Sequence, residues 1–329
     1  MTSPLARNSS KLLLVAAVLV ATATAALAAP RSRNPSQAPS RDGGEYQALP
    51  LTRSPQNHLL VRVYINGKLA LLGVDTGAPI SAIARNRRAY YGLGGLSPSA
   101  SVPARLMING ALNNVVVAQT MRLGGLTLAD EPMVAVDLGG GSRAASMRGE
   151  QEIDGILGAD ILFPTKAVID CERQLLVMKM NPDTPGTIPG FDHRGYESVP
   201  ILVSEGYNLY VDAKINGRSA RLMLDTGAFA TLLHRGFVRG MNLSLRDTPL
   251  RSAAVNLKQR GVQLARINRL SLGAVNIVGK DVGVVDLEGL IHGGLLDANP
   301  PVAGLLGAEI LRRHGGIIDF GTRKLYLKG

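Results

Sequence analysis

The chain contains the same sequence twice. When residues 46–80 are set against residues 196–230 without a gap, 14 of the 35 positions are identical, where composition alone would give roughly two or three. A second stretch of identity follows at an offset of 149, where residues 155–162 align with residues 304–311. A tandem duplication of this kind predicts two copies of one folding unit, because each copy keeps the same pattern of apolar and polar positions.

Domain boundaries follow from the repeat and from local composition. We assign the first domain to residues 46–180 and the second to residues 196–329. The segment between them, residues 181–195, is rich in Pro and Gly and is expected to be a linker. With 329 residues and a hydrophobic fraction of 46 %, the chain is long enough for each copy to bury a core of its own.

Each copy is predicted to be all-β. Two β-prone runs flank Asn66-Gly67 in the first copy, and Asn-Gly between such runs is the strongest short-range signal for a β-hairpin. The second copy repeats the pattern around Asn216-Gly217. Short strands at close spacing, with little sign of helix, favour a small closed β unit in each half.

An identical Asp-Thr-Gly-Ala segment follows the returning strand of this hairpin in both copies, at residues 75–78 and 225–228. A single Asp-Thr-Gly is usually a turn at the end of a strand. Two equivalent copies packed about a two-fold axis would instead bring Asp75 and Asp225 together. Adjacent carboxyls share one proton, so that one takes a proton from a bound water while the other donates to a carbonyl. Amide hydrolysis needs that chemistry.

These motifs resemble those of the retropepsin-like (clan AA) aspartyl protease family, for which such a shared-proton pair is established. In both copies Asp-Thr-Gly-Ala is followed about 80 residues later by two hydrophobic residues and Gly, ending at Gly158 and Gly307. The resemblance covers nearly all of both predicted domains. It implies two closed β-barrels related by pseudo-two-fold symmetry, with Asp75 and Asp225 as the catalytic dyad.

The resemblance also implies a set of supporting residues around the dyad. Thr76 and Thr226 would clasp the opposite half through their hydroxyls, and Gly158 and Gly307 would lie on strands that cross beneath the catalytic loops. The glycine of each motif fits because the backbone must turn sharply there and bring its N–H groups near the carboxyls. The remaining predicted site residues are Gly77, Ala78, Gly227 and Ala228.

Two residue types near the motifs allow further predictions. Ala78 and Ala228 cannot donate the side-chain hydrogen bond to an ionised carboxyl that Ser or Thr would donate. We therefore expect a mildly acidic pH optimum of roughly 4–6.5. Asp160 and Glu309 directly follow the later glycine motif and are predicted to accept hydrogen bonds at the start of a short helix, not to act as catalytic acids.

Two features depart from the family pattern. Gly73 stands where the second copy has Met223, which would loosen the strand before the first aspartate. Neither copy shows a clear signature of the flap hairpin that is expected to cover the site. The flap candidates, for each of which an ordinary surface hairpin is the alternative, are Asn109-Gly110 and the turn near Arg260-Gly261.

Residues 1–29 are predicted to be a secretory signal peptide. Basic residues precede an apolar run that ends in a small-residue cleavage site, Ala-Leu-Ala at 26–28. An uncleaved anchor is the alternative, because residues 12–29 are just long enough to cross a thin bilayer. Residues 30–45 are expected to be a flexible tether. The sequence thus predicts a periplasmic or secreted protein that meets a membrane only if the anchor is retained.

Composition excludes several other classes of function. A single cysteine, Cys171, and five scattered histidines exclude a multi-thiolate or histidine-rich metal site, and no cofactor is expected. The formal net charge is +11, but the basic residues are dispersed and Trp is absent, so we expect no nucleic-acid partner. The histidines are not accompanied by a Gly-x-Ser-x-Gly motif, which speaks against a serine hydrolase.

The sequence therefore predicts an exported aspartic endopeptidase, which hydrolyses peptide bonds of a peptide or protein substrate with a water activated between Asp75 and Asp225. The alternative is a non-catalytic peptide-binding module with the same fold. Complete Asp-Thr-Gly-Ala segments in both copies favour catalysis, because a binder has no need of both carboxyls. A third arrangement, in which each half pairs with its twin in a second chain, would make the protein a homodimer.

Overall fold

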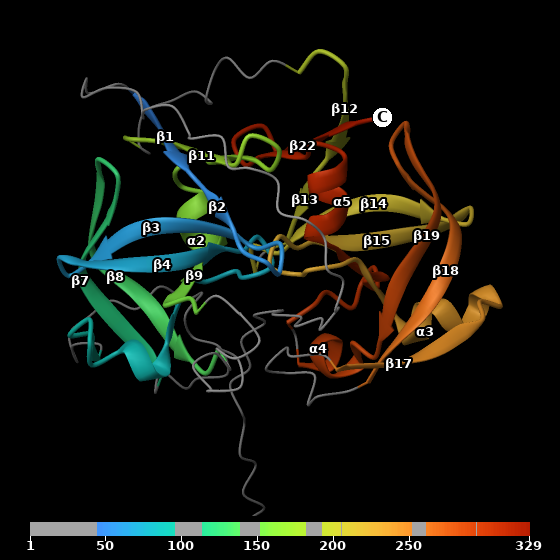
Figure 1. The fold of residues 1–329 in the computed structure, drawn as a ribbon, viewed down its shortest axis with the longest axis horizontal. Coiled ribbons are helices and arrows are strands. Elements are labelled where there is room, and N and C mark those ends of the chain that lie inside the picture. The colour runs from blue at the N-terminus through green and yellow to red at the C-terminus, as the bar shows by residue number, and fades with distance from the viewer. Residues whose placement is uncertain are drawn as a thin grey trace, which may run out of the picture.

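The computed structural model describes residues 45–95, 114–138, 152–181, 193–204, 206–251, 261–293 and 295–329. They form two β-barrels that lie side by side, with one further sheet spanning an end of both (Figure 1). Several sequence predictions fall outside the described residues: the signal peptide, nearly all of the tether, most of the linker, and the Asn109-Gly110 turn.

The first barrel is a closed ring of six strands. Its order is β3-β4-β9-β5-β8-β7, and β7 pairs back to β3 through Tyr64 with Arg122 and Ile65 with Met121. Short edge strands β2 (Thr52–Arg53) and β6 (Gly94–Gly95) extend the ring. The ring strands are β3 (Leu59–Ile65), β4 (Lys68–Val74), β5 (Ala82–Ala84), β7 (Val115–Leu123), β8 (Leu126–Val136) and β9 (Gly155–Leu157).

The second barrel repeats the same ring in the same order. It runs β14-β15-β20-β16-β19-β18 and is closed by pairing of β18 with β14. Strands β13 (Leu202–Val203) and β17 (Leu245–Arg251) extend it. The predicted pair of closed all-β barrels with pseudo-two-fold symmetry is confirmed. The ring strands are β14 (Leu209–Ile215), β15 (Arg218–Leu224), β16 (Leu232–His234), β18 (Gly261–Leu272), β19 (Val275–Val285) and β20 (Gly304–Leu306).

The hairpins that begin the two rings have the predicted turns. Asn66 and Gly67 have φ values of 48° and 78°, and Asn216 and Gly217 have φ values of 49° and 83°. Two successive residues with positive φ are the two-residue hairpin turn whose twist matches that of the flanking strands, and Asn-Gly tolerates it best. Both predicted hairpins are confirmed.

Helix is short and sparse in the described residues. Helix α2 (Ala159–Leu162) and helix α5 (Ala308–Arg313) each begin directly after the later glycine motif, as predicted. Among the described residues, no helix is long and apolar enough to cross a membrane. The other helical segments are η1 (Arg85–Arg87), α3 (Arg235–Val238), η3 (Arg239–Met241) and α4 (Glu288–His292).

A six-stranded sheet joins the two barrels. Its central pair, β10 with β21, is antiparallel and places Ile169 opposite Ile318. Each half contributes three strands, so residues about half a chain apart become neighbours in one ladder. One chain therefore supplies both halves of the pseudo-symmetric pair. In sheet order, the strands are β1 (Tyr46–Pro50), β11 (Leu175–Lys179), β10 (Val168–Asp170), β21 (Ile317–Asp319), β22 (Lys324–Lys328) and β12 (Tyr196–Pro200).

Cys171 lies where this sheet meets the core. The structure divides residues 167–178 into β10 and β11, with a turn at residues 171–174. Gln174 in that turn has a φ of 56°, a conformation that strand periodicity does not reveal. Cys171 itself is 2 % exposed and belongs to the main hydrophobic core, as expected for a small packing residue.

Candidate active site

The two predicted aspartates occupy equivalent places at the ends of β4 and β15. The backbone N–H of Asp75 donates to the Leu157 carbonyl at 3.0 Å, and that of Asp225 donates to the Leu306 carbonyl at 3.1 Å. The acceptors end β9 and β20, which run parallel to β4 and β15. The side chains of Asp75 and Asp225 are 4 % and 0 % exposed. Each aspartate is thus hydrogen-bonded through its backbone to a strand of its own barrel, and it is buried where the two barrels meet.

Two threonines join the halves directly beside the aspartates. The Thr76 hydroxyl donates to the Leu224 carbonyl at 2.7 Å and accepts the Thr226 N–H at 3.1 Å. Reciprocally, the Thr226 hydroxyl donates to the Val74 carbonyl at 2.7 Å and accepts the Thr76 N–H at 3.0 Å. All four hydrogen bonds are buried and cross between the halves, at the place where the sequence predicts a clasp. Their reciprocity locates the pseudo-two-fold axis at this point.

The glycine of each motif packs against the aspartate of the other half. A Cβ placed on Gly77 would lie 2.7 Å from Cγ of Asp225, and one placed on Gly227 would lie 2.5 Å from Cγ of Asp75. Only glycine therefore fits at either position. The two carboxyls are held between the two loops, each against the backbone of the opposite one.

Backbone N–H groups orient each carboxyl. Oδ1 of Asp75 accepts the Gly77 N–H at 2.8 Å. Oδ1 of Asp225 accepts the N–H groups of Gly227 and Ala228, both at 2.9 Å. Ala78 and Ala228 are fully buried, and neither has a side chain that can donate. The carboxyls are thus restrained without any hydroxyl donor from the adjacent residue.

The electrostatics of the pair favour a single shared proton. Burial raises the pKa of Asp75 to about 6, against the opposing effect of the backbone N–H donors and of a hydrogen bond from Asp225. Burial and the neighbouring Asp75 charge raise the pKa of Asp225 well above its ordinary value. The two carboxyls therefore keep one proton between them, because two buried like charges in contact are costly.

One oxygen of the pair has no protein donor. Oδ2 of Asp225 is buried and accepts no hydrogen bond from the described residues. A buried carboxyl oxygen without a partner is costly, and a proton on this oxygen, shared with Asp75, removes the cost. The geometry and the raised pKa of both carboxyls therefore agree that the pair holds a shared proton.

Gly158 and Gly307 pack closely against the segments that follow Asp75 and Asp225. A Cβ on Gly158 would lie 2.7 Å from the Ala78 carbonyl oxygen, and one on Gly307 would lie 2.6 Å from the Thr231 nitrogen. The sequence expects both glycines on strands, but each is one residue past the end of its strand, at the start of α2 or α5. Each glycine thus lies where a short helix begins, in close contact with the segment that follows the aspartate.

Sequence reasoning missed two hydroxyl residues that connect these parts. The Ser81 hydroxyl donates to Oδ1 of Asp160 at 2.7 Å and accepts the Gly158 N–H at 2.9 Å. Thr231 accepts the Gly307 N–H at 3.1 Å through its hydroxyl. The available signal was position, since each hydroxyl residue stands six residues after its aspartate.

Asp160 and Glu309 act as the predicted hydrogen-bond acceptors. Asp160 accepts the Ser81 N–H at 2.9 Å, and Glu309 accepts the Thr231 N–H at 2.9 Å. Glu309 also lies 3.0 Å from the Lys280 ammonium. Both carboxylates thus connect the start of a short helix to the segment that leaves the aspartate loop.

The halves differ at Gly73 and Met223. Gly73 remains inside β4, paired with Leu60 and with Ile156, so the strand continues through it. A Cβ on Gly73 would lie 3.6 Å from Cδ1 of Ile153. Met223 is fully buried in a cluster of the second half. The predicted loosening therefore takes the form of less side-chain packing, with the ladder intact.

The flap candidates are only partly described. Strands β17 and β18 form a hairpin in which Arg251 pairs with Gly261, so the turn near Arg260-Gly261 belongs to this hairpin. Arg260 and the rest of its tip lie outside the described residues, as does Asn109-Gly110. The role of either segment as a flap stays a prediction.

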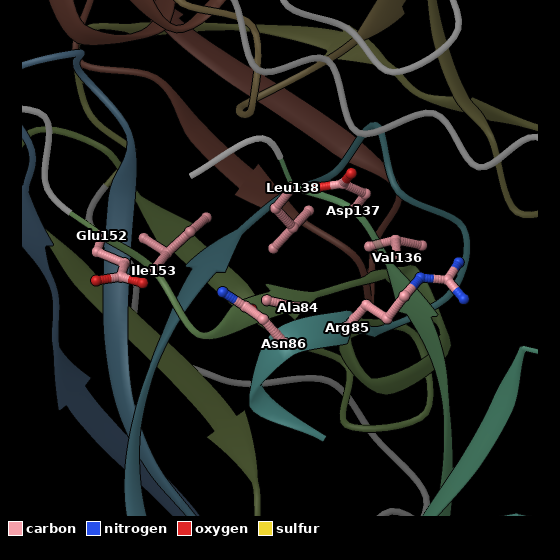
Figure 2. Close-up of a pocket in the computed structure, with 8 residues that line it drawn as sticks. All are labelled: Ala84, Arg85, Asn86, Val136, Asp137, Leu138, Glu152 and Ile153. Carbon is pink, nitrogen blue, oxygen red and sulfur yellow. The ribbon is translucent and has the colours of Figure 1, made fainter. Parts of the chain in front are cut away.

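A cavity of about 280 Å³ lies in the first half, apart from the aspartates. Figure 2 shows it between the ends of β5 and β8, with Asp137 and Glu152 at opposite sides and the Asn86 amide directed inward. The second half has His234 at the position of Ala84, and the His234 Nδ1 accepts the Leu287 N–H at 3.0 Å. The second half thus carries an imidazole at the position of Ala84, a residue that lines the cavity in the first half.

No group of three or more His, Cys, Asp or Glu side chains that could hold a metal ion occurs within the described residues.

Comparison with known sequences identifies the class of protein. The family model described as "Aspartyl protease" matches residues 61–161 and 211–310, one match in each barrel and together more than half of the chain. The protein belongs to the aspartyl protease family, with two retropepsin-like domains in tandem.

Individual relatives are distant. The chain is 30 % identical over 137 residues to the UBA domain-containing protein Mud1 of Schizosaccharomyces pombe, a match covering 40 % of this chain and 37 % of Mud1. The chain therefore matches little more than a third of the length of this curated relative.

Three solved structures are also similar. The retropepsin-like aspartic protease from Rickettsia conorii is 21 % identical, with 40 % of this chain and 90 % of that chain covered and a TM-score of 0.31. Basic 7S globulin from soybean is 12 % identical, with 86 % and 94 % covered and a TM-score of 0.42. A protein named edgp is 11 % identical, with 87 % and 95 % covered and a TM-score of 0.47.

Proposed function

We propose that this protein is an aspartic endopeptidase with one active site, formed between its two halves. The observation that carries the proposal is the buried pair of Asp75 and Asp225, each packed against the glycine of the opposite loop. Family membership supports the same reaction class. Two complete carboxyl loops, restrained by backbone donors and joined by the threonine clasp, are more than a passive peptide-binding groove requires.

The proposed reaction uses a water held between the carboxyls. Ionised Asp75 accepts a proton from this water as its oxygen attacks the peptide carbonyl carbon, while protonated Asp225 donates its proton to the carbonyl oxygen. The product of this step is a tetrahedral diol. As the C–N bond breaks, the proton on Asp75 passes to the leaving nitrogen and a diol hydroxyl returns a proton to Asp225. Both carboxyls end in their starting states.

The buried setting assists each proton transfer. Donors that already point at Oδ1 of both aspartates need no reorganisation when charge moves between the carboxyls. The raised pKa values keep one proton on the pair over the mildly acidic range, where general acid and general base are both available. This supports the pH optimum of roughly 4–6.5 expected from the sequence.

The decisive experiment is cleavage of an unstructured protein substrate across pH 3–8. We expect Asp75→Asn and Asp225→Asn each to lose at least about 1,000-fold in kcat/KM, because either change removes one of the two proton-transfer partners. Asp212→Asn is the matched control, since that carboxylate is 75 % exposed on β14. Wild-type activity in either dyad variant would refute the mechanism.

The same experiment addresses the alternatives. If the wild type cleaves nothing and binds no peptide analogue of the tetrahedral intermediate, the peptide-binding module replaces the enzyme. If the halves pair between chains, the active species has twice the chain mass in light scattering. Our proposal of an internal pair predicts an active monomer.

We also propose that the protein acts outside the cytoplasm, on the strength of the signal-like residues 1–29. N-terminal sequencing of the protein recovered from a cell fractionation tests this. A mature chain that begins near residue 30 in the periplasmic or secreted fraction supports export, and an intact cytoplasmic chain contradicts it.

A further inference from the structure

Three large apolar side chains are exposed at one end of the first barrel. Leu69 is 51 % exposed, Tyr90 is 49 % exposed and Tyr64 is 40 % exposed. They are three of the six large hydrophobic residues that are exposed within the described part of the chain. Exposed apolar side chains that gather in one place mark an interaction surface, whereas single ones need no explanation.

The strand ladder places these side chains together. Tyr64 of β3 lies opposite Leu69 of β4 and, on its other side, opposite Arg122 of β7. The three residues form one row across neighbouring strands, and residues in one row project from the same face of a sheet. Tyr90 adjoins this row, because the hydroxyl of the next residue, Tyr91, donates to the Leu69 carbonyl at 3.1 Å.

Cations lie over both exposed tyrosine rings. Cζ of Arg122 is 4.6 Å from the centre of the Tyr64 ring. Nζ of Lys68 and Cζ of Arg87 are each 4.7 Å from the centre of the Tyr90 ring. Three apolar and three basic side chains thus form one surface, which we call the aromatic–basic patch: Tyr64, Leu69, Tyr90, Lys68, Arg87 and Arg122.

The patch lies in a strongly basic part of the chain. Between Glu45 and Asp130 there are eight Lys and Arg residues, and the only acidic residue is Asp75, which is buried. Of the three patch cations, Arg87 is paired with Asp154 at 2.6 Å. Basic residues that are dispersed along the sequence therefore gather here around exposed apolar side chains.

The second half lacks this patch although it has the same hairpin. Ser271 takes the place of Arg122 in the ladder, where it pairs with Lys214. Folding of the hairpin therefore does not require exposed apolar residues at these places, and their presence in the first half needs another reason. The residues 150 positions after Tyr64, Leu69 and Tyr90 are Lys214, Ser219 and Gly240.

The patch is remote from the aspartates. Leu69 lies near the start of β4 and Asp75 directly follows its end, so about 20 Å of extended strand separates them. The hairpin of β3 and β4 reaches the side of the first barrel that is turned away from the second barrel (Figure 1). A surface bound at the patch leaves the junction of the barrels open.

We propose that the aromatic–basic patch docks this protein onto a membrane surface that contains anionic lipids. Leu69 and the two tyrosines enter the boundary between headgroups and acyl chains, where such side chains are favoured. The three cations interact with the negative lipid headgroups. This contact is additional to the N-terminal segment, and it does not depend on the endopeptidase activity.

Two features favour a lipid surface over single-stranded nucleic acid. Leu69, the most exposed of the three apolar residues, has no ring on which a base could stack. The faces of the Tyr64 and Tyr90 rings are already in contact with the protein's own cations. The patch therefore combines an aliphatic centre with a basic surround, which complements an anionic membrane.

Co-sedimentation with vesicles tests the proposal. The chain is used from residue 30 onward, because the apolar run before it would itself bind lipid and every described residue lies after it. We expect binding to vesicles of phosphatidylcholine and phosphatidylglycerol in equal parts to be at least about tenfold tighter than binding to phosphatidylcholine alone. Equal binding to the two kinds of vesicle would overturn the proposal.

Leu69→Ser and Arg122→Ser introduce the residue type that the second half carries at each place, so the barrel should fold with them. Each should weaken binding to the anionic vesicles at least about fivefold. The matched controls are Val278→Ser, 70 % exposed on β19, and Arg246→Ser, 62 % exposed on β17. They should change binding by less than about twofold, because they are far from the patch.

The remaining outcomes also decide. If the patch variants bind vesicles as tightly as the controls do, or if the wild type binds a single-stranded DNA oligonucleotide in place of vesicles, the proposal is wrong. Cleavage of a soluble substrate without vesicles should be the same in Leu69→Ser as in the wild type. Loss of lipid binding is thereby distinguished from failure of the proposed endopeptidase function.

Discussion

The threonine clasp offers the most direct test of how the two halves are held in register. Thr76→Val keeps the volume of the side chain and removes its hydroxyl. The change leaves two buried backbone groups without partners, the Leu224 carbonyl at 2.7 Å and the Thr226 N–H at 3.1 Å. Solvent water cannot take the place of the lost hydroxyl, because Thr76 is 0 % exposed.

The expected cost follows from those two groups. Each unsatisfied buried polar group destabilises by about 1–3 kcal/mol, so Thr76→Val should lower the free energy of unfolding by roughly 2–6 kcal/mol. Against a typical stability of about 5–15 kcal/mol, this is a large fraction. Thr76→Ser retains the hydroxyl and should cost about 1 kcal/mol or less, since only one methyl group is lost.

Urea unfolding followed by circular dichroism measures the effect. We expect a lower midpoint with an unchanged m-value for Thr76→Val. Thr127→Val, at an exposed position on β8, is the matched control and should change stability by less than about 0.5 kcal/mol. If Thr76→Val is as stable as the control, the hydroxyl bonds across the halves do not stabilise the fold and the reasoning fails.

Three further predictions concern the site and the core. Gly227→Ala, whose Cβ would lie 2.5 Å from Cγ of Asp75, should lower kcat/KM by at least about 100-fold, whereas Gly95→Ala, in open space on edge strand β6, should not; equal activities would contradict the packing argument. Asp75 has a folded pKa raised to about 6 by burial, so its contribution to stability is present below about pH 4 and is lost as pH rises through 6. Urea midpoints at pH 4 and pH 7 should therefore differ less in Asp75→Asn than in the wild type, and an equal difference would count against the raised pKa. Burial raises the pKa of the Cys171 thiol to about 12, so thiol reagents should modify it only after unfolding; rapid labelling of the native protein would show that the thiol is accessible.

The local features of each barrel were predictable because they depend on neighbouring residues. Asn66-Gly67 and Asn216-Gly217 indicate their turns through the positive φ that these residues accept. The short helices after the later glycine motif were also predictable from neighbouring residues, because Asp160 and Glu309 directly follow that motif and acidic residues favour the start of a helix. Where a turn lacks such residues, as at Gln174, the sequence does not mark the turn although φ there is positive.

The candidate site likewise contains residues that the sequence predicted and residues that it did not. Asp75 and Asp225 were found from the repeated Asp-Thr-Gly-Ala, since only the duplication raises that short motif above an ordinary turn. Ser81 and Thr231 were missed, because their importance lies in accepting N–H groups from residues 76 or 77 positions away. Such contacts leave no periodic pattern in the chain.

From the sequence alone it follows that one β-rich unit occurs twice and that each copy carries an identical Asp-Thr-Gly-Ala segment. The tertiary structure alone showed that the two copies of one chain share a sheet and that each glycine confines the opposite aspartate. The physical reason is that strand pattern and turn chemistry are local properties. The raised pKa of both carboxyls arises from burial and contact between residues 150 positions apart.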